Sequence, residues 1–239
     1  RDRTHPVYLF AIRRTAWQSI HAAAHPGYLL RTTEDNRFTM VRVNAILNAP
    51  DSSGAFITEI HVATIEDSIS RLQFRGPAIF DIKVREHIEA VLLPLVDKIL
   101  TELKLPLKSY DISAVNAGIA SSQDASIHIS GFSADLPITI GLLGAALDVP
   151  IKESIYTTGH IASLNGEIRS IRGLELKAKA VAALDKRNSH FLYPSPDSSL
   201  GYSATIEMEL REMRGHIRAH PISRLIEAVP YTFDQIDVI

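Results

Sequence analysis

The 239-residue chain is 46% hydrophobic and 22% charged with a net charge of −2, which suits a globular protein that buries a sizeable core. The near-neutral charge leaves no basic footprint for nucleic acid, so a nucleic-acid partner is not expected. The chain has no cysteine and no apolar run of membrane-spanning length, which excludes disulfides and thiolate chemistry and predicts a cytoplasmic protein without a membrane partner.

The N-terminal segment has the pattern of a helix over residues 6–24, where apolar side chains recur on one side. Pro26-Gly27 ends this pattern. We therefore expect a helical arm or linker over residues 1–36 and one domain over residues 37–239. From the abrupt start at Arg1 we expect either a trimmed chain or a fragment.

The first half of the domain predicts a long β-hairpin followed by a helix. Residues 38–47 and 55–65 alternate like strands and are joined by turn residues, and a short strand is expected at 71–74. Apolar residues recur at helical spacing over residues 81–104, where Pro94 should kink or split the helix.

Short strands and helices alternate through the rest of the chain. Strands are expected at residues 110–115, 126–129, 154–164, 167–171, 190–193 and 216–219. Helices are expected at residues 136–147, 174–186, 207–213 and 222–229. This alternation predicts an α/β fold built on a mixed sheet.

Lys177 lies on the apolar side of the expected helix 174–186. At helical spacing it shares a face with Leu174, Val181 and Leu184. Burying an ammonium group is costly unless the group is paired or neutralised. Lys177 is therefore either a lysine that extends to solvent at the edge of this face, or a base whose pKa is lowered by desolvation.

Ser133 lies just before the expected helix 136–147, where free backbone N–H groups favour developing negative charge. It is either a loop serine or a nucleophile that needs a base for its proton. Gly131-Phe132-Ser133 begins like a nucleophile elbow, but Asp135 stands where the second glycine would be. The segment is therefore a poor match to the α/β-hydrolases.

Several segments around these two residues form a pattern: Ser133-Ala134, Val149-Pro150-Ile151, Thr158-Gly159, Asn165-Gly166-Glu167-Ile168 and Gly173-Leu174-Glu175-Leu176-Lys177. This pattern resembles the proteolytic domain of Lon proteases over about residues 38–229. The resemblance implies that domain's mixed sheet with flanking helices and an N-terminal β-hairpin. It also implies a Ser133–Lys177 dyad, with Thr158 holding the lysine amine and backbone N–H groups from Ser133 to Asp135, Ala134 included, binding the oxyanion.

The chain departs from the Lon pattern around the serine, where Phe132 and Asp135 replace a proline and a glycine. Asp135-Leu136-Pro137-Ile138 also resembles the Lon-like domains of bacterial DNA-repair and competence ATPases, which have generally lost the dyad. Because both dyad positions are kept, we expect a serine endopeptidase. The alternative is a catalytically degenerate module that forms rings or docks a partner.

Asp135 allows three interpretations. Its carboxylate caps the helix 136–147, or narrows the site, or pairs with Lys177 and keeps that lysine charged and the site dormant.

The resemblance also sets expectations about partners. A peptide or protein substrate and a homo-oligomeric ring, commonly a hexamer, are implied, and peptide cleavage needs no metal or organic cofactor. The chain has no Walker A segment, so an ATPase would be a further domain or a partner. Two histidine pairs at a spacing of four, His21/His25 and His216/His220, are only a weak metal signal, and His128 is expected to be a core histidine.

Overall fold

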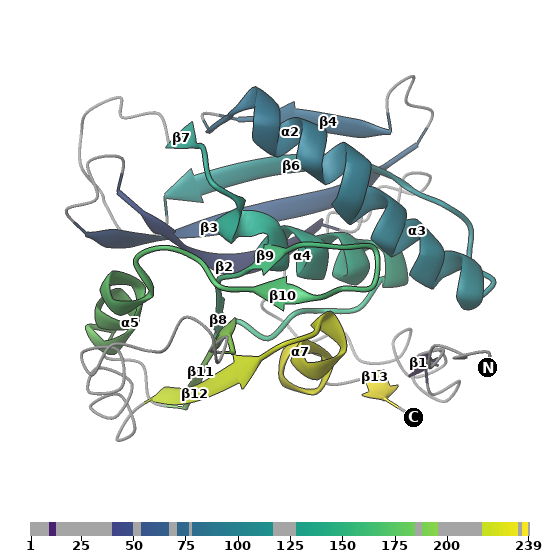
Figure 1. Ribbon diagram of the computed structural model, residues 1–239. Coiled ribbons are helices and arrows are strands. Elements are labelled where there is room, and N and C mark those ends of the chain that lie inside the picture. Colours follow the sequence, from purple (N-terminus) through teal and green to yellow (C-terminus); the bar gives the residue numbers. More distant parts are fainter. Residues whose placement is uncertain are drawn as a thin grey trace, which may run out of the picture.

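A computed structural model of the chain describes residues 10–12, 40–49, 54–66, 71–76, 78–116, 128–184, 188–195, 217–233 and 236–238. Its main feature is a seven-stranded sheet with the order β12-β11-β8-β2-β3-β6-β4 (Figure 1). The strands are β2 (Met40–Asn48), β3 (Ala55–Ile65), β4 (Leu72–Arg75), β6 (Ser109–Asn116), β8 (Ile155–Thr157), β11 (Ser189–Pro194) and β12 (Ile217–Ile222). The β2–β3 and β3–β6 pairs are antiparallel and the other pairs are parallel. The predicted α/β fold with a mixed sheet and a β2–β3 hairpin is therefore confirmed.

The predicted helix over residues 81–104 is a continuous helical run in three parts. These are α2 (Ile82–His87), a π-helical turn η1 (Ile88–Leu92) and α3 (Leu93–Glu102). Pro94 falls in the first turn of α3, where its missing N–H costs least, so the chain changes helix type before the proline. The other α-helices in the described part of the chain are α4 (Asp135–Leu147), α5 (Leu174–Ala182) and α7 (Leu225–Thr232).

The two faces of the sheet carry separate apolar clusters because strand side chains alternate. Val41 and Val43 of β2 join the large cluster that α3 and α4 cover, whereas Ile46 belongs to the smaller cluster under α5. Figure 1 shows α5 apart from α2, α3 and α4. The catalytic candidates therefore come from both sides of one sheet, Ser133 from the α4 side and Lys177 from the α5 side.

Gly141 sets how closely α4 packs on the sheet. A Cβ atom added there would lie 2.6 Å from Val62 Cγ2, whereas one added at Gly144 would lie 2.9 Å from Cδ1, the mobile end of Ile151. Both changes to alanine gain the same helix propensity, so the difference reports the clash. We expect Gly141→Ala to be less stable than Gly144→Ala by roughly 1–3 kcal/mol in urea unfolding. Equal unfolding midpoints would show that α4 can shift freely on β2 and β3.

Three predictions along the chain need correction. Phe10–Ile12 is not helical but forms β1, which pairs antiparallel with the unpredicted β13 (Ile236–Val238). This pairing joins residues from the two ends of the chain, so no local pattern could show it. The rest of the predicted helix 6–24 and the helix 207–213 lie outside the described residues, and the boundary at residue 36 stays a prediction.

The second correction concerns the expected single strand over residues 154–164. It is divided into β8 and β9 (His160–Ile161), and β9 pairs with β10 (Ile168–Arg169) instead of the main sheet. The chain leaves the sheet at Gly159, whose N–H donates to Ser133 O at 3.1 Å. The third correction is that the last predicted helix begins at Leu225 because Ile222 still belongs to β12.

A short parallel pair, β5 (Ile79–Phe80) with β7 (His128–Ile129), lies beside α2 and leads towards Ser133. His128 is half-exposed and pairs with Asp81 at 2.6 Å, so the expectation of a core histidine is wrong. Within the described residues, no helix has the length and apolar character needed to cross a bilayer.

Candidate active site

Ser133 lies in a short 3₁₀ turn, η2 (Phe132–Ala134), that runs directly into α4. The Ser133 side chain is half-buried. Two backbone hydrogen bonds fix the turn to the chain that follows β8, from Gly159 N to Ser133 O and from Leu136 N to Gly159 O, both 3.1 Å. The position of the serine is therefore set by the end of a sheet strand as well as by α4.

Lys177 is completely buried on the inner side of α5. Its amine donates hydrogen bonds to Ile46 O at 2.7 Å and to Thr158 Oγ1 at 3.0 Å. The interpretation of a lysine extending to solvent is therefore wrong. Desolvation lowers the pKa of Lys177 to about 7, as the second interpretation expected, so a large share of these amines is neutral at neutral pH.

Thr158 connects the lysine to the serine turn. Its hydroxyl accepts from Lys177 Nζ and donates to Ser133 O at 3.3 Å. A neutral amine has two N–H groups and one lone pair. Ile46 O and Thr158 Oγ1 engage both N–H groups, which leaves the lone pair of Lys177 to accept a proton. Among the described residues, no hydrogen bond joins Lys177 Nζ to Ser133 Oγ.

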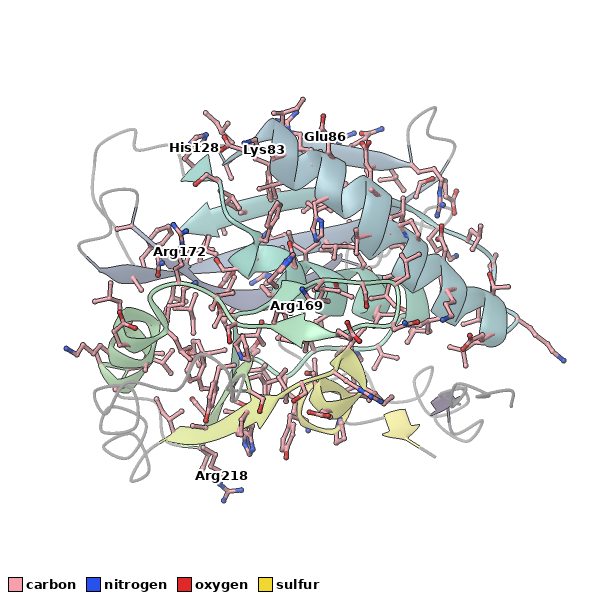
Figure 2. The ribbon with its side chains drawn as sticks, in the orientation of Figure 1. Lys83, Glu86, His128, Arg169, Arg172 and Arg218 are labelled. Atoms are coloured by element: carbon pink, nitrogen blue, oxygen red, sulfur yellow. The ribbon has the colours of Figure 1, made fainter. Side chains whose placement is uncertain are left out.

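Gly173 holds the start of α5 against β2. It has a φ of +66°, and an added Cβ would lie 2.7 Å from Asn48 Nδ2. The same Asn48 amide donates to Arg172 O at 3.1 Å, and Figure 2 shows Arg172 beside the start of α5. A glycine is needed here because of both the positive φ and the close approach, and the contact fixes the helix that carries Lys177.

Asp135 is fully buried, and the predictions that it caps the helix or pairs with Lys177 are wrong. It occupies the first position of α4, where the preceding Ala134 is the cap residue and no side chain caps the helix. Its Oδ2 atom instead accepts from His160 Nδ1 at 2.6 Å and Ile161 N at 3.2 Å. The carboxylate thus faces β9, and among the described residues it makes no ion pair or hydrogen bond with Lys177.

The sequence was compared with known proteins. No known family profile matches the chain. A curated protein, the archaeal Lon protease of Methanocaldococcus jannaschii, is 28% identical to it over 152 residues. The chain is a distant homologue of archaeal Lon protease. The match covers 63% of this chain but only 21% of that protein, so the chain spans a small part of its relative's length.

Neither the Lon resemblance nor the spacing of histidines pointed to His87 and His160. His87 Nε2 lies 3.1 Å from Asp135 Oδ2, and this hydrogen bond raises the pKa of His87. The sequence did carry a signal that His87 faces inward, because His87 falls at helical spacing with the apolar Val84. Val84 is buried, whereas Lys83 and Glu86 are exposed and point away from the sheet (Figure 2). His160 follows the Thr158-Gly159 segment directly, but nothing local showed that it would face Asp135.

Proposed function

We propose that the chain is the proteolytic domain of a Lon-type serine peptidase, with the fold of that domain, and that it cleaves peptide bonds through Ser133. The observation that carries the proposal is the buried amine of Lys177, which has no carboxylate partner among the described residues. Its pKa of about 7 and its hydrogen bond to Thr158, which in turn bonds the backbone oxygen of Ser133, suit a base that serves the Ser133 hydroxyl. The distant homology to archaeal Lon protease supports the same assignment.

In the proposed reaction, Ser133 Oγ turns about its Cα–Cβ bond and donates its proton to the lone pair of Lys177 Nζ. The oxygen then attacks the peptide carbonyl carbon, and the carbonyl oxygen takes the negative charge. Backbone N–H groups of Ser133 and Ala134 are the proposed donors to this oxyanion, because the N–H of Asp135 already donates to Phe132 O.

Collapse of this intermediate breaks the C–N bond as Lys177 returns the proton to the leaving amine. Water, deprotonated by the same lysine, then hydrolyses the acyl-serine and regenerates both groups. These steps need only the residues named, and no cofactor is proposed for them.

A second candidate is the catalytically degenerate Lon-like module that forms rings or docks a partner. The observation in its favour is that Lys177 bonds Ile46 O and Thr158 Oγ1 while Ser133 Oγ makes no bond to it within the described residues. For the peptidase we propose a homo-oligomeric ring that works with an ATPase domain or partner. A peptide or protein substrate is proposed for the active form alone.

Covalent labelling of Ser133 by a fluorophosphonate separates the two candidates. We expect one modified serine, Ser133, found by mass spectrometry and absent in Ser133→Ala. Thr158→Val removes the hydroxyl that orients Lys177, so labelling should slow by roughly 100-fold because the base is misplaced. Thr158→Ser keeps the hydroxyl and should label at a rate near that of the parent. No labelling of the parent in any oligomeric state would favour the degenerate module.

A further inference from the structure

The side chains of His87, Asp135 and His160 have no part in the proposed cleavage, yet they lie close together, and Asp135 is only two residues after Ser133 in the sequence. They come from three elements, the last residue of α2, the first residue of α4 and the first residue of β9. One potential ligand atom of each residue lies within 4.8 Å of those of the others. The cluster is therefore a product of the tertiary fold and not of one local motif.

The contacts of the Asp135 carboxylate are one-sided. Oδ2 lies within hydrogen-bond distance of three nitrogens, His160 Nδ1, Ile161 N and His87 Nε2. Oδ1 is buried and has no hydrogen-bond partner. A fully buried carboxylate with one unsatisfied oxygen is costly, and native proteins seldom leave such an atom unpaired. An additional positive group that reaches both oxygens would remove this deficit.

The aromatic ring of Phe132 covers the cluster on one side. Its centroid lies 4.7 Å from that of His87 and 5.1 Å from that of His160. The two imidazole side chains are only 15% and 25% exposed. A bound ion would therefore be shielded from bulk water on the Phe132 side.

We propose that His87, Asp135 and His160 bind one divalent transition-metal ion of the zinc type. Two imidazole nitrogens and a carboxylate oxygen form a ligand set that zinc accepts at distances of about 2.0–2.2 Å, with a fourth position left for water. Calcium and magnesium prefer sites made of oxygen atoms alone, so this set disfavours them. Binding requires the nitrogens that now face Asp135 to give up their protons, which each ring does by carrying its proton on the other nitrogen. For His87, Nε2 would also exchange its hydrogen bond to Ile161 O, now 3.0 Å long, for the bond to the metal.

Such an ion would link α2, α4 and β9 around the turn that holds Ser133. It would fix that turn through Asp135 without touching the Ser133 hydroxyl or Lys177. The inference therefore goes beyond the proposed function, and metal binding is measured without any substrate. The variant Ser133→Ala should bind the metal as the parent does, which separates a failure of this inference from a failure of the peptidase assignment.

The test is calorimetric titration of the untagged, metal-free chain with zinc chloride, with magnesium chloride as the comparison. We expect one zinc ion per chain at the highest-affinity site, no comparable binding of magnesium, and a rise of the unfolding temperature that increases with zinc concentration. His87→Gln and His160→Gln change half-buried residues and should each weaken this binding by at least about 50-fold.

The matched control is His190→Gln/His220→Gln. These two rings also meet, with 2.9 Å between Nδ1 and Nε2, but no carboxylate bonds to either ring in the described part of the chain. The control should keep the parent's zinc affinity. Parent-like binding by His87→Gln and His160→Gln, or no zinc binding by the parent, would overturn the site.

A second measurement covers the case in which a variant does not fold. Cobalt added to the parent should broaden the imidazole NMR signals of His87 and His160 selectively, because it is paramagnetic and accepts the same ligands. Unchanged signals from both rings would refute the site without any variant.

Discussion

Ser133→Ala is expected to lower the rate of casein or fluorogenic peptide cleavage at least about 1,000-fold, and Lys177→Met to lower it by a similar factor. The first change removes the nucleophile and the second removes its base. The two groups act in one proton transfer, so the double variant should be no slower than either single variant. Initial rates over a range of substrate concentrations would show the loss in kcat more than in KM.

Matched controls make this result specific to the two groups. Lys179→Met changes an exposed lysine on the same helix, and Ser130→Ala an exposed serine three residues before Ser133. Both should cleave at the parent rate. Lys177→Arg should be inactive although it keeps the positive charge, because a guanidinium stays protonated and cannot act as the base. Activity that survives both Ser133→Ala and Lys177→Met would remove the dyad from the account.

Much of the fold follows from patterns within single elements. The period of two in β2 and β3 and the helical spacing around Val84 and Leu174 predicted these elements within a few residues. The same spacing placed Lys177 on the apolar face of α5 but left open whether its amine extends to solvent, and the structure shows that the amine is buried with a lowered pKa. These features depend on neighbours two to four residues away, which a sequence displays directly.

The features that were missed depend on contacts between distant segments. Asp135 has the residue type of a helix cap and directly precedes the predicted helix 136–147, yet its carboxylate binds His160 and Ile161, which belong to another element. The chain leaves the sheet at Gly159 because that residue bonds the serine turn, and β1 finds its partner at the far end of the chain. No pattern of spacing within one element contains this information, so the His87–Asp135–His160 cluster was visible only in three dimensions.

The last prediction concerns stability, because the pKa of Lys177 falls from its ordinary value of 10.5 to about 7 in the folded chain. Between these two values the unfolded chain binds a proton that the folded chain does not. The free energy of unfolding should therefore rise with pH in this window, and this contribution is lost as the pH falls towards 7. Between pH 7 and 9.5 the lysine should add about 3 kcal/mol to the free energy of unfolding, with a slope that approaches 1.4 kcal/mol per pH unit in the middle of this range.

Urea unfolding of the parent and of Lys177→Met at several pH values isolates this contribution, because all other titrating groups are common to both proteins. The parent should gain stability relative to Lys177→Met as the pH rises from 7. Parallel curves would mean that Lys177 keeps its proton when folded, and a lysine charged at neutral pH could not accept the proton of Ser133. The same protonation governs catalysis, so kcat/KM should rise with pH through an apparent pKa of about 7. If the stability difference follows this course while labelling of Ser133 fails, the chain would keep the buried base of a peptidase without the geometry to use it.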